Sequence, residues 1–175
     1  IPMSVLGQNL VEGVLRVAIF LAYLILVSRM KDIRRVFSYH GAEHKTIFCY
    51  ERGLELTVEN VRKMPRHHPR CGTSFLFVVI ILAILCYSVL FSFLTPPNVL
   101  VRILLQIVLI PVVVGIAYEI NRYVGRHDNA VTRVVTAPGL WLQNFTTFEP
   151  DDSMMEVGIE ALKQVIPEEK GKDQW

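Results

Sequence analysis

The sequence predicts an all-α integral membrane protein with three transmembrane helices, a helical cytoplasmic loop and a short amphipathic C-terminal helix. Hydrophobic residues make up 52% of the 175 residues, and the mean hydropathy of +0.40 is high for a soluble domain. These residues are concentrated in three blocks, each close to the roughly 20 residues that a helix needs to cross a bilayer. This distribution is typical of a membrane protein.

The first apolar block runs from about residue 10 to residue 27, inside a first region of residues 1–28. Glu12 and Arg16 lie four residues apart near its start, where a helix would place them on one face as an ion pair. A buried core helix would also explain this block, but its length favours a membrane span. The second block, residues 74–94, contains no charged residue and is the clearest of the three.

The third apolar block covers residues 99–118 and contains Pro111. A proline inside a spanning helix frees a carbonyl that neighbouring protein or water must satisfy. The second and third blocks are separated by Thr95-Pro96-Pro97-Asn98, a tight-turn sequence. Residues 74–118 are therefore predicted to form an antiparallel transmembrane hairpin.

Basic residues are concentrated in the loop between the first two blocks, and the Pro-Pro turn has none. The positive-inside rule therefore predicts that residues 29–73 are cytoplasmic and that the tail, residues 119–175, is cytoplasmic or interfacial. A basic loop beside a membrane also attracts anionic lipid, which is an alternative explanation of these charges. Nucleic acid is not expected as a partner, because the charges are not interleaved with exposed aromatic residues. The basic residues are Arg29, Lys31, Arg34, Arg35, Lys45, Arg52, Arg62, Lys63, Arg66 and Arg70.

The loop has helical signals of its own. No glycine or proline lies between Ser28 and His40, so we expect the first spanning helix to continue through this stretch and to end near Gly53. A second, short helix is predicted to start at Thr57 and to stop at Pro65.

The tail combines a turn, an interfacial segment and a helix. Residues 137–139 (A-P-G) predict a turn, and residues 139–148 are rich in aromatic and leucine side chains, which suits the membrane interface. Residues 153–156 (S-M-M-E) read as a capping box that starts an amphipathic helix ending near Ile166. Residues 167–175 are charged, and we expect them to be frayed.

Residues 40–44 read H-x-x-E-H, the inverted form of a zinc-hydrolase helix motif. On a helix, His40 and His44 would share one face and could bind one metal ion, with Glu43 as a general base. A pair of hydrogen-bonded core histidines is the alternative. Gly41 argues against a helix here, because glycine costs about 1 kcal/mol relative to alanine inside one.

The spacing of apolar residues around the motif predicts which way the histidines point. Alternating three- and four-residue steps place both histidines on an apolar stripe and the basic residues on the other face. The histidines are therefore expected to point into protein. The stripe is Met30, Ile33, Phe37, His40, His44 and Ile47, and the polar face is Lys31, Arg34, Arg35 and Lys45.

All but one of the five histidines lie in the basic loop, and His67 and His68 are followed by Cys71. Histidine and thiolate are preferred zinc ligands, and His68 and Cys71 have a common ligand spacing. Packing of the spanning helices could bring both groups together at the cytoplasmic face, where Glu119 could join them. Alternatively, the two histidines are a solvated pair, Cys71 is a small apolar residue and Glu119 reaches water.

Two chemistries remain open for a site that binds zinc or a similar divalent transition metal. If His40, His44, His68 and Cys71 all bind, the site is closed and structural. If three of them bind and water takes the fourth place, Glu43 could activate that water for hydrolysis. The cysteines Cys49, Cys71 and Cys86 are too scattered to suggest a disulfide framework.

Six short motifs are distributed along most of the chain. They are Y-H-G-A-E-H-K-T at 39–46, E-N-V-R-K at 59–63, H-P-R-C-G-T-S-F at 68–75, Y-E-I at 118–120, A-P-G-L-W-L-Q at 137–143 and E-P-D-D at 149–152. Together these motifs resemble the DUF1385 (YqhQ-like) family of bacterial membrane proteins. The resemblance implies a multi-pass protein of the bacterial inner membrane, often labelled a metal-dependent enzyme. Family members are usually longer, with a preceding G-G-Q-A-V-I-E-G-V-M-type region, so we expect this chain to correspond to the C-terminal part of the family's length.

The leading hypothesis is a metal-dependent, hydrolytic membrane enzyme with Glu43 as its base. The first alternative is a non-enzymatic channel or transporter, in which Arg16, Gln106 and Glu119 line a polar path. The second is a membrane scaffold that binds a cytoplasmic partner through the basic loop. In each case we expect a homo-oligomer in contact with the lipid bilayer.

Overall fold

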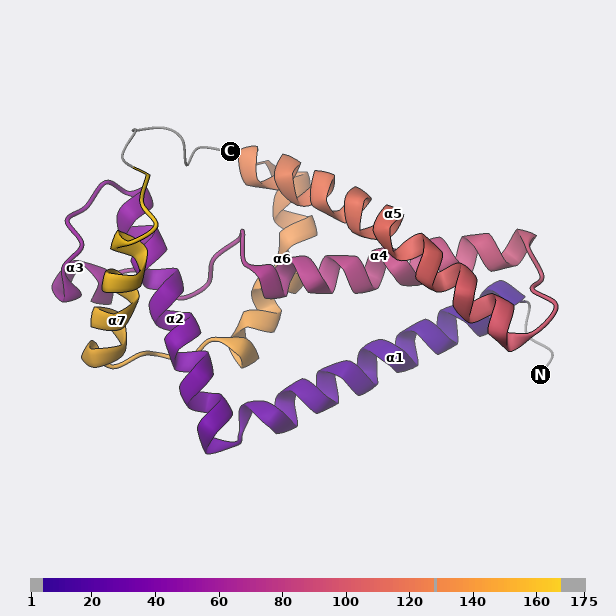
Figure 1. The fold of residues 1–175 in the computed structure, drawn as a ribbon, viewed down its shortest axis with the longest axis horizontal. Coiled ribbons are helices and arrows are strands. Elements are labelled where there is room, and N and C mark those ends of the chain that lie inside the picture. The colour runs from indigo at the N-terminus through magenta and orange to yellow at the C-terminus, as the bar shows by residue number, and fades with distance from the viewer. Residues whose placement is uncertain (1–4, 128, 168–175) are drawn as a thin grey trace.

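Three long helices dominate the computed structural model, which describes residues 5–127 and 129–167. Helices α1 (Val5–Ser28), α4 (Gly72–Phe93) and α5 (Val99–Arg126) each contain a segment long and apolar enough to cross a membrane. In Figure 1 the start of α1 lies near the turn between α4 and α5, and both α1 and α5 contact α4. The described residues form helices and no strands, which confirms the all-α prediction.

The remaining helices gather at the opposite end of α4. Helices α2 (Lys31–Glu51), α3 (Val58–Arg62) and α7 (Asp152–Lys163) pack on one another, and α6 (Ala130–Thr146) lies between this group and α4 (Figure 1). Burial of their apolar side chains stabilises the group. Its core consists of Ala42, Cys49, Val61, Met64, Met155 and Ile159.

The predicted continuity of the first spanning helix into the motif helix is wrong. Helix α1 ends at Ser28, whose hydroxyl donates to the Ile25 carbonyl (2.9 Å), and Met30 is extended (φ −70°, ψ 135°) before α2 begins. Nothing in the local sequence enforces this break. It follows from packing of α2 against α7, because tertiary contacts override a weak local preference. The predicted end near Gly53 is confirmed, since α2 ends at Glu51 and Gly53 has a positive φ of 66°.

Helix caps agree with the sequence for α3 and differ from it for α7. Thr57 accepts a hydrogen bond from the Asn60 backbone N–H (3.3 Å) at the start of α3, as predicted. The predicted cap at Ser153 is wrong. Asp151 caps α7 by accepting from the Met154 N–H (3.0 Å), and the Ser153 hydroxyl donates to the Asp151 carboxylate instead. Helix α7 ends at Lys163, earlier than predicted. Residues 168–175, for which fraying was expected, lie outside the described part of the chain.

The turn predicted at residues 137–139 is also wrong, because α6 continues through Pro138. Proline removes one helical hydrogen bond but leaves the rest of the helix intact. Gly139 serves helix packing: a Cβ atom there would lie 2.7 Å from the Ser74 Cβ atom on α4. The predicted interfacial segment is therefore mostly the second half of a helix pressed against α4.

The segment between α6 and α7 lies directly against the motif helix at Gly41. A Cβ atom on Gly41 would lie 2.1 Å from the Phe148 carbonyl oxygen, and the Phe148 N–H donates to the Phe37 carbonyl (3.0 Å). The predicted exposure of Lys45 is consequently wrong. Its side chain is buried, pairs with Glu149 and donates to the Arg62 carbonyl (3.1 Å). This face of α2 is covered by segments that are distant in sequence.

Substitution of Gly41 by alanine tests this close approach. We expect Gly41→Ala to lower the free energy of unfolding by about 1–3 kcal/mol through overpacking, although alanine by itself favours a helix by about 1 kcal/mol. Gly115→Ala is the matched control, because a Cβ atom there meets nothing within 4 Å. Thermal unfolding in detergent, followed by circular dichroism, measures both. Equal melting temperatures for the two variants would contradict the predicted clash.

Candidate metal centre

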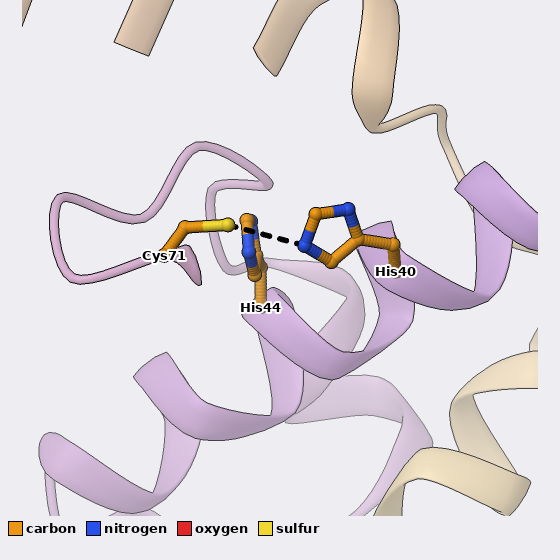
Figure 2. A group of neighbouring side chains, drawn as sticks. All are labelled: His40, His44 and Cys71. Carbon is orange, nitrogen blue, oxygen red and sulfur yellow. Dashed lines mark hydrogen bonds between the residues drawn. The ribbon is translucent and has the colours of Figure 1, made fainter. Parts of the chain in front are cut away.

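Three of the four predicted metal ligands lie together. His40 and His44 occupy successive turns of α2, and Cys71 approaches them from the residue before α4 (Figure 2). One ligand atom from each residue lies within 4.8 Å of the other two. His40 Nε2 lies 3.2 Å from Cys71 Sγ. Atoms at these separations could converge on one ion.

Both histidine rings are fixed by backbone carbonyls. His40 Nδ1–H donates to the Thr146 carbonyl (2.8 Å), and His44 Nδ1–H donates to the Arg66 carbonyl (2.6 Å). A carbonyl can only accept, so Nδ1 carries the hydrogen in both rings and Nε2 is left as the available ligand atom. Metal-bound histidines in proteins almost always have such an outer hydrogen bond.

Cys71 lies where a thiolate is stabilised. It caps α4, where the Thr73 backbone N–H donates to its sulfur (3.4 Å) and the Thr73 hydroxyl lies 3.1 Å away. Burial alone would raise the pKa of Cys71, but hydrogen bonds from His40, His44 and Thr73 outweigh burial and lower this pKa to about 4.

The pKa of His40 is shifted in the opposite direction to that of Cys71. Burial would lower the pKa of His40, but its hydrogen bonds to Cys71 and to the Thr146 carbonyl raise it overall. Without a metal, these two opposite pKa shifts favour a thiolate at Cys71 and a protonated imidazole at His40. The thiolate is also the form of cysteine that binds metal ions.

His68 is buried beside these residues but is engaged elsewhere. Its Nδ1 accepts from the Arg70 backbone N–H (3.2 Å), and its Nε2 lies 3.3 Å from a Glu51 carboxylate oxygen. The centroid of its ring is 5.8 Å from that of His44. His68 therefore forms a wall of the site and does not belong to the group of three converging ligands.

A pocket of about 230 Å³ opens beside the three ligands and includes Glu43 in its lining. Glu43 is exposed, and its charge contributes to the raised pKa of His40. The arrangement thus combines two nitrogen donors, one sulfur donor, a carboxylate and an open space. The lining residues are His40, Glu43, His44, Ile47, Glu51, His68, Arg70, Cys71 and Gly72.

Other residues singled out in the sequence lie elsewhere. Glu119 is on α5, exposed and 3.8 Å from Arg122, and it does not line the pocket, so the expectation that it could join the site is wrong. His67 has a buried Nε2 atom without a hydrogen-bond partner. Arg16 and Gln106 line a separate cavity of only about 20 Å³. Within one chain, the three side chains of the channel hypothesis therefore do not line a common path.

Sequence reasoning missed Gln143, which is completely buried. Its amide donates to the His68 carbonyl (2.7 Å) and to the Ser74 hydroxyl (2.7 Å), and its oxygen accepts from the His68 N–H (2.8 Å). A glutamine inside the apolar 139–148 segment was the available signal. The backbone carbonyls that orient His40 and His44 could not be found from the sequence, because every residue has a backbone carbonyl.

The thiolate at Cys71 can be measured in metal-free protein. Since its pKa is about 4, the thiolate already predominates at higher pH, and we expect its alkylation by iodoacetamide to be nearly constant between about pH 5 and 8. His40→Ala should raise the pKa and make the rate increase about tenfold per pH unit. Peptide mass spectrometry measures each cysteine separately. A Cys71 rate that already rises about tenfold per pH unit in the parent chain, as expected for His40→Ala, would refute the ion pair of Cys71 and His40.

Comparisons with known proteins agree with the resemblance noted in the sequence. The family described as "Protein of unknown function (DUF1385)" matches residues 2–168. The chain is 40% identical over 162 residues to "Uncharacterized protein YqhQ" of Bacillus subtilis (strain 168), a match that covers 91% of this chain and 49% of that protein. The chain thus spans about half the length of this curated relative. No solved structure matches it. On the family match and this identity, the chain belongs to the DUF1385 family.

Proposed function

We propose that the protein is a metal-dependent hydrolase of the bacterial inner membrane. His40, His44 and Cys71 would hold zinc or a similar divalent metal ion, and Glu43 would act as the general base. The observation that carries this proposal is the orientation of both histidines: each donates Nδ1–H to a backbone carbonyl, and Cys71 lies beside the remaining nitrogens. A donor set of nitrogen and sulfur suits zinc.

The geometry favours an open site over a closed structural one. Both nitrogens of His68 already have partners, so it is not available as a fourth ligand without rearrangement. Catalytic zinc sites commonly use three protein ligands and keep one position for water. A bound metal ion would supply a water molecule whose pKa is near 7. The 230 Å³ pocket provides the room for that water and for a substrate group.

Glu43 has the position expected of the base. It precedes His44 on the same helix, lines the same pocket and is exposed to solvent. It would accept the proton of the water and later return that proton to the leaving group. His40 and His44 would keep their orientation throughout, because their carbonyl partners belong to the backbone.

The His40–Cys71 contact also supports a second candidate, a metal-free hydrolase in which the Cys71 thiolate is the nucleophile. A cysteine beside a histidine at a helix N-terminus is activated in this way. The presence of a second histidine favours the metal-dependent mechanism. A cysteine nucleophile needs only one imidazole beside it. Here two imidazoles, His40 and His44, are both held with Nδ1 protonated, and both interact with the Cys71 sulfur.

Metal analysis of protein purified without a histidine tag distinguishes the two candidates. We expect near-stoichiometric zinc or a similar metal in the parent chain and its loss in His40→Ala, His44→Ala and Cys71→Ser. His68→Ala should retain the metal, because His68 is not in the converging group. His127→Ala is the control, since His127 stacks on Tyr123 away from this pocket. A metal-free parent chain with a reactive Cys71 would replace the metal proposal with the thiolate mechanism.

Substitution of the base separates metal binding from chemistry. Glu43→Gln should keep the metal and lower the rate of hydrolysis of chromogenic ester or phosphodiester substrates by about 10²–10⁴-fold, the usual contribution of a general base. Rates are compared at equal metal content. An undiminished rate in Glu43→Gln would remove Glu43 from the mechanism.

The proposed orientation places the site on the cytoplasmic side, because the basic loop contains it and the α4–α5 turn lacks basic residues. A cysteine at Pro97 should therefore react with an impermeant maleimide added to intact cells, and a cysteine at Glu55 should react only after lysis. Both residues are exposed, and neither side chain caps a helix. The parent chain measures labelling of the native cysteines, and the opposite pattern would reverse the orientation.

A further inference from the structure

Two neighbouring pockets lie on α5 and α6, and we call them the basic end and the apolar end of the α5–α6 groove. The basic pocket, of about 430 Å³, lies where the end of α5 meets the start of α6 and the Pro69–Arg70 turn. The apolar pocket, of about 630 Å³, lies further back along α5. Val124 and Thr132 line both pockets, so the two are adjacent. In Figure 1 the end of α5 and the start of α6 lie next to each other.

The basic end has the chemistry of a phosphate site. Arg70, Arg126, His127 and Arg133 line it. Arginine suits phosphate oxygens because its guanidinium group presents several donors in one plane. His127 Nδ1–H donates to the Tyr123 carbonyl (2.9 Å), which leaves Nε2 for a ligand.

The apolar end has the chemistry of an acyl-chain site. Its lining is mainly aliphatic, with Ile116, Ile120, Val124, Val131 and Val135, and it runs along a helix apolar enough to cross a membrane. Glu119 is the exception, but its exposed carboxylate lies 3.8 Å from Arg122. The two ends together match a molecule with an anionic head and a hydrocarbon tail.

We propose that this groove binds one anionic phospholipid. The phosphate lies at Arg126 and Arg133, and an acyl chain follows the apolar pocket along α5. This site is distinct from the exposed basic face of α2, where charge alone would attract a lipid surface. It differs from nonspecific attraction because it needs both the arginines and the apolar groove.

Arg70 connects the groove to the candidate metal centre. Its side chain lines both the basic pocket and the pocket beside Cys71, and it pairs with Glu51 (2.6 Å). The absence of a side chain at Gly125 makes room for this arrangement, since a Cβ atom there would lie 3.2 Å from the Arg70 Cδ atom. A bound lipid headgroup would therefore lie next to the proposed hydrolytic site. The lipid binding itself does not depend on that proposal.

Native mass spectrometry of the chain in neutral detergent tests the site, with phosphatidylglycerol and phosphatidylcholine of identical acyl chains as probes. We expect phosphatidylglycerol to bind more tightly. Arg126→Gln and Arg133→Gln should each weaken it by about fivefold, which corresponds to about 1 kcal/mol per basic residue near a membrane surface. Phosphatidylcholine binding should change less, because its headgroup is zwitterionic.

Gly115→Phe tests the apolar end, because its side chain would enter the pocket from a position where a Cβ atom meets nothing within 4 Å. Gly115→Phe should weaken the binding of both lipids. An unchanged melting temperature would show that the fold is intact. Arg35→Gln, on the exposed face of α2, is the charge-matched control and should change neither.

Three outcomes would overturn the proposal. They are equal effects of Arg35→Gln and Arg126→Gln, unchanged lipid binding in Gly115→Phe, and a change of oligomeric state in Gly115→Phe without a change in lipid binding, which would make the groove an interface between chains. Metal content is measured in the same samples. A metal-free parent chain would refute the hydrolase proposal, and unchanged lipid binding in the variants would refute the lipid site, so the two failures are distinguishable.

Discussion

The contact between Gly41 and Phe148 is the constraint on which the surroundings of the site depend. Only a glycine lets the segment after α6 lie against α2, since a Cβ atom would come within 2.1 Å of the Phe148 carbonyl oxygen. Thr146, the last residue of α6, orients His40, and Glu149 in the following segment pairs with Lys45. The glycine inside the H-x-x-E-H motif weakens the helix locally, and the packing it permits compensates for this cost.

The turn that contains His68 and Cys71 is held in place by polar contacts rather than by apolar packing. Gln143 ties the backbone at His68 to α6 and to Ser74 on α4. These groups are buried, so loss of the amide would leave His68 N–H and C=O without partners, at about 1–3 kcal/mol for each buried group left unpaired. The same network fixes the turn that carries Cys71 next to α2. A small rigid polar frame of this kind positions ligand atoms more accurately than a loop would.

The position of Cys71 at the N-terminus of α4 explains the electrostatics of the candidate metal centre. Cys71 caps a helix whose next 22 residues form an apolar candidate span. Its charge is stabilised by the helix N-terminus and by His40, while the pocket remains open on the other side. Arg70 lines both the pocket beside Cys71 and the basic pocket at the end of α5. The proposed chemistry and the proposed lipid site therefore fit one location.

The sequence by itself determined the features that depend on neighbours along the chain. Apolar blocks predicted three long helices, Thr57 marked the start of α3, and a four-residue spacing placed His40 and His44 on one helix face. The tertiary structure decided two features of the helices, the break at Met30 and the continuation of α6 through Pro138. It also decided the surroundings of three side chains: Lys45 is buried, Glu119 lies away from the candidate site, and His68 contacts Glu51. These features depend on contacts between distant segments, such as His40 with Thr146. Helix propensity and hydropathy describe only a residue and its near neighbours, so they do not reveal which backbone carbonyl will face a given ring.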